Sequence, residues 1–297
     1  RNPKTSLGNI CALFGISRQA FYDAQKQEQK ASVAEMIVLC LVRELRTIMP
    51  MIGARKLLYE LQLPLKEHGI KMGRDQLFEL LRFNGLLIRK RMRYVQTTNS
   101  YHWLKKYPNH AEHLILNASE QLWVSDITYI RTLQGFNYLS LITDAYSRKI
   151  VGHCLYPTLE AIGCIGALEM AIQSRNKDCK LMHHSDRGIQ YCSYNYVQIL
   201  RINLITISMT QSGSPYENAL AERVNGIIKN EFSPKRIYQN HEEAKTILAS
   251  NIEVYNNRRP HASLNYLTPS AAHEMTGDFV KQWKHYPYFK RTESVNQ

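Results

Sequence analysis

The pattern of apolar residues changes near residue 121, and this change restricts the fold more than any other feature of the sequence. Beyond it, three apolar or alternating segments separated by turns predict strands in hairpins, over residues 122–131, 136–143 and 149–155. Helical and strand-like patterns then alternate through residues 159–209. Hairpins followed by this alternation indicate an α/β domain with a mixed sheet, in which 122–131 is the central strand.

The N-terminal segment has helical periodicity instead. Apolar residues over 7–14 predict a short helix, Gly15 marks a turn, and Ser17 is a natural N-cap for a second helix over 18–27. This order is typical of a helix-turn-helix, although any helical hairpin has the same pattern. The residues at the start of the second helix, where such motifs contact DNA, are Arg18, Gln19 and Tyr22.

Three further segments with helical periodicity (33–47, 54–61 and 74–84) predict a small helical module. A basic run follows, formed by Arg89, Lys90, Arg91 and Arg93. With aromatic residues nearby, such a run can hold a phosphate backbone, or it can be a solvated linker. We therefore predict five parts: a helix-turn-helix (1–30), a helical DNA-binding module (31–95), a basic linker (96–118), the α/β core (119–275) and a basic, aromatic tail (276–297).

The positive charge of the chain is concentrated at its front. Residues 1–115 hold 19 basic and 9 acidic side chains, whereas residues 116–297 hold 19 and 16. A segment this basic suggests a polyanionic partner such as nucleic acid, because Lys and Arg release counterions when they neutralise phosphates. A basic protein that is merely well solvated is the alternative.

Membrane insertion and disulfide or zinc chemistry find little support. No apolar stretch approaches the ~18 residues that a membrane span needs, and no apolar signal region begins the chain, so we expect a cytoplasmic protein with no membrane partner. The six cysteines are scattered without a C-x-x-C pair, which supports neither a zinc ribbon nor a redox pair. The neighbours His183 and His184 lack cysteine partners and are expected to be structural.

Three carboxylates stand out by their predicted positions. Asp126 lies inside an apolar strand, where a charge costs several kcal/mol unless it is paired or bound to a metal. Asp186 follows a predicted buried strand, at the edge where ligands bind to α/β sheets. Glu222 lies in a helix predicted to open with a capping box at 214–217, on the face that also holds Asn218, Asn225 and Lys229.

Each carboxylate also has an ordinary interpretation. Asp126 can be a buried hydrogen-bonding group, Asp186 a turn former, and Glu222 an ion-pair partner of Lys229 or Arg223 on a solvated face. If a mixed sheet brings the three together, however, their repulsion calls for hard cations between them. Mg²⁺ prefers oxygen ligands, and two such ions can activate the attacking oxygen and stabilise the leaving oxygen in phosphoryl transfer. We expect two Mg²⁺ ions, replaceable by Mn²⁺, and no zinc.

The motifs around these carboxylates resemble the catalytic core of bacterial insertion-sequence transposases, of the IS-three family type. The matching residues are 123–129 (WVSDITY), 184–188 (HSDRG), Gln190-Tyr191, Asn218-Ala219, Glu222 and Lys229. Fifty-nine residues separate Asp126 from Asp186, and 35 separate Asp186 from Glu222, which is the Asp-35-Glu signature of that group. The resemblance extends to the leading helix-turn-helix and to a C-terminal motif over residues 255–269. Glu217 departs from it, because the family usually has Asp before Asn-Ala.

The resemblance implies a ribonuclease-H-like, integrase-like core preceded by a small all-α helix-turn-helix DNA-binding region. It implies a DNA transposase in which Asp126, Asp186 and Glu222 hold the metal ions, and which cleaves the ends of an insertion sequence and joins them to target DNA. Its partners would be the terminal inverted repeats, target DNA and further copies of the chain, with which it forms a dimer or larger assembly. It would be a cytoplasmic, nucleoid-associated protein of a bacterium.

Several basic residues have open roles within this prediction. Lys229, seven residues after Glu222 and so on the same α-helical face, would hold a DNA phosphate or pair with a nearby carboxylate. Arg258 and Arg259 would contact DNA or, with His261, pack a closing loop; Arg187 beside Asp186 is equally ambiguous. The alternatives for the whole protein are a ribonuclease-H-like nuclease that does not join DNA and a DNA-binding regulator without catalysis.

Overall fold

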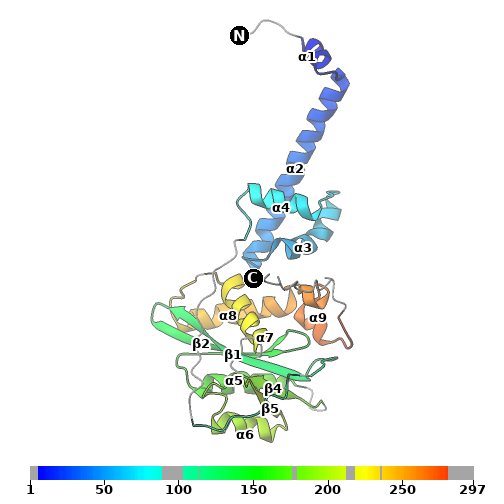
Figure 1. Ribbon diagram of the computed structural model, residues 1–297. Helices are drawn as coiled ribbons and strands as arrows, with labels where there is room; N and C mark the ends of the chain where they lie inside the picture. The colour runs from blue at the N-terminus through cyan, green and yellow to red at the C-terminus, as the bar shows by residue number, and fades with distance from the viewer. Residues whose placement is uncertain are drawn as a thin grey trace, which may run out of the picture. The chain divides into compact units, whose positions relative to one another are not determined.

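The computed structural model describes residues 6–88, 103–112, 114–175, 179–211, 218–234 and 236–279 of the 297. The chain forms two compact units, residues 1–91 and 92–297 (Figure 1). No helix in the described part is both long and apolar enough to cross a membrane.

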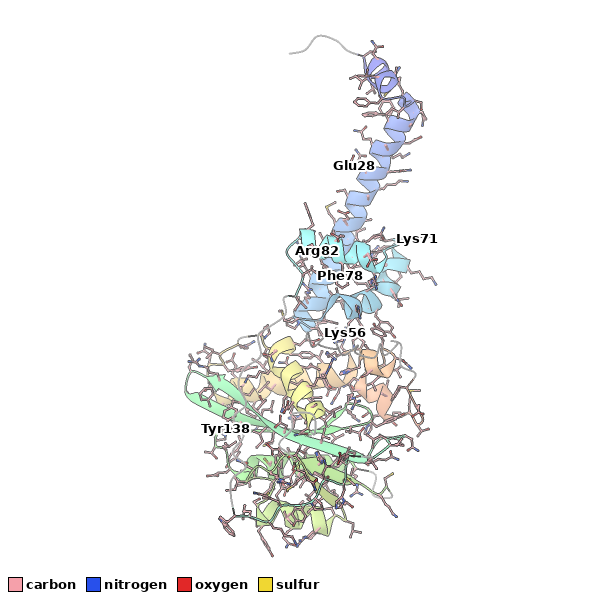
Figure 2. The ribbon with its side chains drawn as sticks, viewed as in Figure 1. Glu28, Lys56, Lys71, Phe78, Arg82 and Tyr138 are labelled. Atoms are coloured by element: carbon pink, nitrogen blue, oxygen red, sulfur yellow. The ribbon has the colours of Figure 1, made fainter. Side chains whose placement is uncertain are left out.

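The first unit is helical. Its described elements are α1 (Leu7–Leu13), α2 (Arg18–Ile48), α3 (Ala54–Glu67) and α4 (Arg74–Phe83). The core of this unit is built by the C-terminal half of α2 with α3 and α4, through the buried side chains Val38, Val42, Leu57, Leu61, Leu77 and Leu81. The N-terminal half of α2, which carries Glu28, is exposed along its length, and Phe78 belongs to α4 (Figure 2).

The predicted turn between the first two helices is confirmed, but the predicted end of the second helix is wrong. Gly15 has a φ of +65°, and Ser17 caps α2 by accepting a hydrogen bond from the amide of Ala20 at 3.0 Å. Helix α2 then continues to Ile48, through residue 30, where a boundary between two modules was expected. The segment contains no Gly or Pro and is rich in Ala, Gln, Lys and Glu, which favour an uninterrupted helix.

The second unit is a five-stranded mixed sheet covered by helices. Its strands are β1 (Leu122–Thr132), β2 (Gly135–Asp144), β3 (Ile150–Tyr156), β4 (Met182–Ser185) and β5 (Thr206–Met209). They lie in the order β3-β2-β1-β4-β5. Strands β1 to β3 are antiparallel neighbours, whereas β4 runs parallel to β1 and β5 parallel to β4. The predicted α/β class, the mixed sheet and the central position of its first strand are confirmed.

Alternate residues of β1 face opposite layers of helices. Its Trp123 packs with α5 (Ala161–Ser174) and α6 (Tyr194–Ile202), whereas Leu122 and Val124 pack with Ala221 of α7 (Ala219–Ile227). On the α7 side also lies α8 (His241–Asn257) (Figure 1). The remaining short elements are η1 (Ile228–Phe232), η2 (Ala262–Leu264) and α9 (Pro269–His273). Each face of the central strand is therefore buried by a different helical layer.

The core extends beyond both of its predicted limits. Within the expected linker, the amide of His110 donates to Ser208 Oγ at 2.9 Å, and Pro108 accepts from the amide of Met209 at 3.2 Å. Past residue 275, Tyr146 donates to the carbonyl of Gly277 at 2.8 Å. These contacts attach residues that were predicted as linker and tail to the second unit: the first segment binds the edge strand β5, and the second binds the turn after β2. Residues 280–297 of the predicted tail lie outside the described part of the chain.

Candidate active site

Asp126 lies on β1, on the face covered by α7. It has the same parity along the strand as Leu122 and Val124, which pack against that helix. Its Oδ2 accepts a hydrogen bond from Asn225 Nδ2 at 2.9 Å, and its Oδ1 accepts one from the amide of Ile127 at 2.9 Å. Asp126 is therefore a hydrogen-bonded group, as its ordinary interpretation predicts. These two hydrogen bonds do not neutralise the negative charge of the carboxylate.

Burial has a large effect on this carboxyl group. It raises the pKa of Asp126 to about 7, although the hydrogen bonds from Asn225 and Ile127 act in the opposite direction. The negative charges of Asp186 and Glu222 raise the pKa of Asp126 further. All three predicted carboxylates thus act on one another through space.

Asp186 is brought beside Asp126 by strand pairing. In the parallel ladder between β1 and β4, Ser125 lies opposite Ser185, so Asp126 and Asp186 are the next residues along two neighbouring strands. Asp186 Oδ1 accepts the amide of Gly188 at 2.9 Å, and a Cβ added to Gly188 would lie 3.0 Å from that oxygen. Asp186 therefore also forms a turn, as its ordinary interpretation predicts. Gly188 suits this turn because it has no Cβ to crowd the Asp186 oxygen.

Glu222 lies in the first turn of α7, the helix that covers the face of β1 on which Asp126 lies. The helix begins at Ala219 after the N-cap Asn218, and the predicted capping box at 214–217 lies outside the described residues. Partial burial, followed by the charge of Asp186, raises the pKa of the largely exposed Glu222. Neither Arg223 nor Lys229 forms a salt bridge with Glu222 in the part of the chain that the structure describes.

The donor set has the chemistry of a site for a hard divalent ion. It consists of carboxylate oxygens from the interior of β1, from the end of β4 and from α7, and oxygen ligands are what Mg²⁺ and Mn²⁺ prefer. Within the described ranges, no three His, Cys, Asp or Glu side chains are grouped tightly enough to surround one ion. The three acids therefore form an open arrangement, coupled by charge.

The neighbouring histidines serve the core of the fold. His183 Nε2 lies 2.6 Å from Ser125 Oγ and 2.9 Å from the hydroxyl of Tyr196, and His184 Nδ1 lies 2.9 Å from Ser208 Oγ. Both side chains are buried, and burial lowers the pKa of His183 to about 3. Two buried, hydrogen-bonded histidines of this kind match the structural role expected for them.

Lys229 does not follow the predicted helical period. The argument that it shares a face with Glu222 assumed an unbroken α-helix, but a π-helical turn, η1, begins at Ile228. Lys229 is exposed within that turn, and partial burial lowers its pKa. The shared α-helical face of Lys229 and Glu222 is therefore wrong. Because π-helical turns are frequent at functional sites, a contact between Lys229 and a DNA phosphate stays a prediction.

Arg259 is not a DNA-binding residue, contrary to its assignment as a DNA contact. Its guanidinium forms a two-pronged ion pair with Glu231, at 3.0 Å from Nε to Oε1 and 2.8 Å from the terminal nitrogen to Oε2. It also lies 2.8 Å from His261 Nε2, and the Arg259 side chain is only 3% exposed. A guanidinium buried and bonded in this way cannot reach DNA, so the packing alternative is correct.

The other predicted DNA contacts stay predictions. Arg18, Gln19, Tyr22 and Arg258 are exposed, although the Gln19 side chain donates to Asp23 at 3.1 Å. The basic run of Arg89, Lys90, Arg91 and Arg93 lies outside the described residues.

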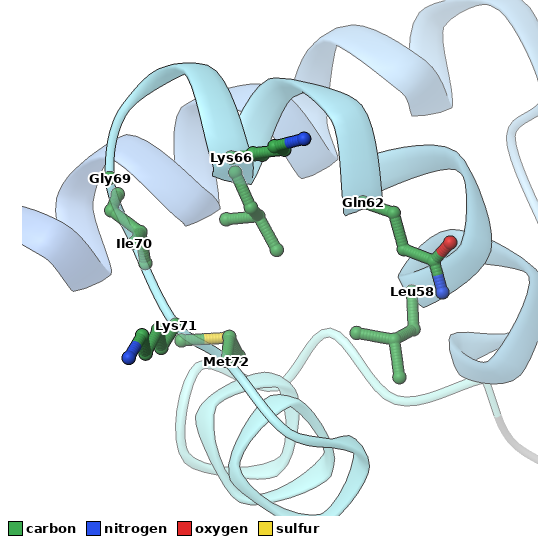
Figure 3. A pocket seen from close by; sticks show the side chains of 8 residues that line it. Leu58, Gln62, Lys66, Gly69, Ile70, Lys71 and Met72 are labelled. Atoms are coloured by element: carbon green, nitrogen blue, oxygen red, sulfur yellow. The ribbon is translucent and has the colours of Figure 1, made fainter.

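A pocket of about 360 Å³ opens elsewhere, in the first unit, between α3 and the segment that precedes α4 (Figure 3). Apolar residues such as Leu58 and Met72 line it together with Lys66 and Lys71. It contains none of the predicted site residues, and the candidate site is the carboxylate group of the second unit.

Without divalent ions, the protein is expected to lose stability as the pH rises from about 4 to about 7. The folded state raises the pKa of Asp126 from 3.8 to about 7, beside Asp186 and Glu222, so it keeps a proton that the unfolded chain has released. This contribution is complete below the unfolded pKa and disappears as the pH passes the folded pKa. Thermal denaturation in EDTA measures it, and Asp126→Asn should remove it; identical pH dependences in both proteins would contradict the assignment.

Comparison with known proteins identifies two matching family descriptions. "Integrase core domain" matches residues 117–215, and a second description of that name matches residues 203–269. Both lie in the second unit and together include the three carboxylates.

Two relatives match most of the chain. The insertion element IS600 uncharacterized 31 kDa protein of Shigella sonnei is 34% identical over 270 residues, 89% of this chain and 97% of that protein. The transposase for insertion sequence element IS629 of Shigella sonnei is 30% identical over 273 residues, 90% of each chain. Among solved structures, the HTLV-2 integrase catalytic core domain in complex with magnesium covers 52% of this chain and 97% of its own, at 18% identity and a TM-score of 0.42.

Proposed function

Since the chain belongs to the insertion-sequence transposases with an integrase core domain and acts in DNA transposition, we propose that Asp126, Asp186 and Glu222 hold its divalent metal ions. The observation that carries this proposal is the electrostatic coupling of the three carboxylates. Asp126 is half-buried beside Asp186, which follows the neighbouring strand β4, and Glu222 approaches from α7. The charge of Asp186 raises the pKa of both Asp126 and Glu222, and cations bound among these acids would offset their repulsion.

The proposed ions are Mg²⁺, or Mn²⁺ in its place. When bound, two such ions activate an attacking oxygen and stabilise a leaving oxygen during phosphoryl transfer. Asp126 supplies oxygens from β1, Asp186 supplies them from the end of the neighbouring β4, and Glu222 supplies them from α7. In cleavage, water attacks the phosphorus at the end of the element and the 3′ oxygen leaves as a hydroxyl. In joining, that hydroxyl attacks a target phosphodiester, with no covalent bond to the protein.

Basic and polar residues of both units are proposed to bind the DNA. Arg18, Gln19 and Tyr22 are exposed at the N-terminal end of α2, the position from which a helix-turn-helix contacts DNA. Lys229 and Arg258 are exposed in the second unit, and the run from Arg89 to Arg93 is proposed on its charge. Because a transposase acts on two ends of an element, we also propose a dimer or larger assembly on DNA.

Cleavage and joining on one substrate test this function. The substrate is a labelled duplex that carries the terminal repeat read from the DNA flanking the coding region, with a supercoiled plasmid as target. With Mg²⁺ we expect cut ends and end–plasmid joint products, and neither in EDTA. Cut ends without joint products would favour the nuclease, and tight binding without metal-dependent products would favour the regulator.

A further inference from the structure

Two asparagines of α7 and its N-cap attach this helix to the central strand. Asn218 Nδ2 donates to the carbonyl oxygen of Ser125 at 3.0 Å, and Asn225 Nδ2 donates to Asp126 Oδ2 at 2.9 Å. Both side chains are buried, with exposed fractions of 6% and 4%. Their spacing of seven residues is two helical turns, so they lie on one face of the helix.

Glu222 lies between these two attachments. It follows Asn218 by four residues and precedes Asn225 by three, so all three belong to one side of the helix. The amides are buried against β1, whereas the Glu222 side chain is exposed. The helix that carries Glu222 is thus fixed to Ser125 and Asp126 on both sides of that residue.

The same contact restrains the carboxylate of Asp126. One of its oxygens accepts from Asn225 and the other from the amide of Ile127. With a donor on each oxygen, rotation of the carboxylate is restricted, and its remaining lone pairs stay available to another ligand. Outer-shell hydrogen bonds of this kind orient the groups that bind metal ions.

Stability alone does not explain an asparagine at this position. The Oδ1 atom of Asn225 is buried and has no hydrogen-bond partner among the described residues. An unsatisfied buried acceptor is unfavourable, and an apolar residue would avoid it. The feature that asparagine adds here is the amide donor directed at Asp126.

We propose that Asn225 is a positioning residue for metal binding. Its amide orients the Asp126 carboxylate and, together with Asn218, fixes the separation between Asp126 and Glu222. This inference rests on the proposed function, because it assigns Asn225 a role toward the same metal ions.

Metal binding by the full chain without DNA tests the proposal. The measured quantity is the rise in melting temperature with Mn²⁺ concentration, since an ion that binds the folded state stabilises it. In Asn225→Leu, which has a similar volume but no donor, the Mn²⁺ concentration needed for a given rise in melting temperature should increase about tenfold or more. Asn225→Ser, which keeps a small polar group, should show the same direction and serves if the leucine variant fails to fold.

Asn256→Leu is the matched control. Asn256 of α8 is also buried, and its amide exchanges two hydrogen bonds of 2.9 Å with the backbone of Ile150, neither of which involves one of the three carboxylates. It should lower the melting temperature and leave the Mn²⁺ dependence unchanged.

Three outcomes would contradict the account, and they distinguish the failure of this inference from that of the proposed function. If Asn225→Leu and Asn225→Ser respond to Mn²⁺ as wild type does while Asp126→Asn loses the response, Asn225 has no positioning role. If Asp126→Asn retains the full response, the metal site itself is wrongly placed. If Asn256→Leu shifts the Mn²⁺ dependence as much as the Asn225 variants, the effect is general loss of packing and the proposal is overturned.

Discussion

Asp186→Asn is expected to reduce metal-dependent DNA cleavage by about a thousandfold or more, roughly 4 kcal/mol of transition-state stabilisation. The substitution keeps the size of the side chain and removes one negative charge from the coupled group of Asp126, Asp186 and Glu222. An amide can still accept the hydrogen bond from Gly188, so the turn should persist while the attraction for a divalent ion weakens. Single-turnover cleavage of the terminal-repeat duplex measures the loss.

Asp278→Asn is a suitable control for this variant, since Asp278 is an exposed aspartate in the same unit. It should cut at the wild-type rate. Asp186→Asn should also bind the end duplex as wild type does, which separates a lost metal ligand from a lost fold. Cleavage by Asp186→Asn within tenfold of wild type would show that the three-carboxylate mechanism is wrong.

Arg259→Met is expected to lower the free energy of unfolding by about 3–5 kcal/mol. It leaves the Glu231 carboxylate, whose side chain is 15% exposed, without the guanidinium that pairs with it. Removing one partner of a buried ion pair costs far more than the pair itself contributes, because an uncompensated charge stays buried. Urea denaturation measures the change, and replacing both partners with Met should restore part of the stability.

An exposed ion pair of the same chemistry provides the comparison. Arg236 and Glu243 are also 2.8 Å apart, but their side chains are 45% and 31% exposed. Arg236→Met should cost less than about 1 kcal/mol, because water screens such a pair. Equal losses for Arg236→Met and Arg259→Met would contradict the view that the burial of the Glu231 pair makes it important to the fold.

The fold was predictable where the periodicity was local and unambiguous. The alternating pattern of β1 and the hairpins after it predicted the mixed sheet and the central place of Asp126. The uninterrupted course of α2 was missed because its middle is polar and exposed, so that stretch of the helix has no apolar stripe. The π-helical turn at Lys229 was missed because helical periodicity does not reveal it. The turn contains Glu231, whose partner Arg259 lies far along the chain, so the sequence gives no local signal of that contact.

The sequence pointed to the three carboxylates of the candidate site, but it did not predict the contact of Asn225 that supports them. Unusual positions for charge drew attention to Asp126 and Asp186, since a carboxylate in an apolar strand or at its end needs an explanation. Asn225 shares a helical face with Glu222, which was the one available signal for it, but only the structure shows its contact with Asp126. Arg259 was misassigned because sequence alone cannot distinguish a buried, paired arginine from an exposed one.

The position of bound Mn²⁺ tests the central claim most directly. Anomalous diffraction from crystals of the chain grown with Mn²⁺ and end duplex locates the ion independently of any activity. The proposed arrangement predicts manganese within about 2.5 Å of carboxylate oxygens of Asp126 and Asp186, with Glu222 at the same centre. Ordered manganese elsewhere in the protein, with none in contact with these three side chains, would contradict it.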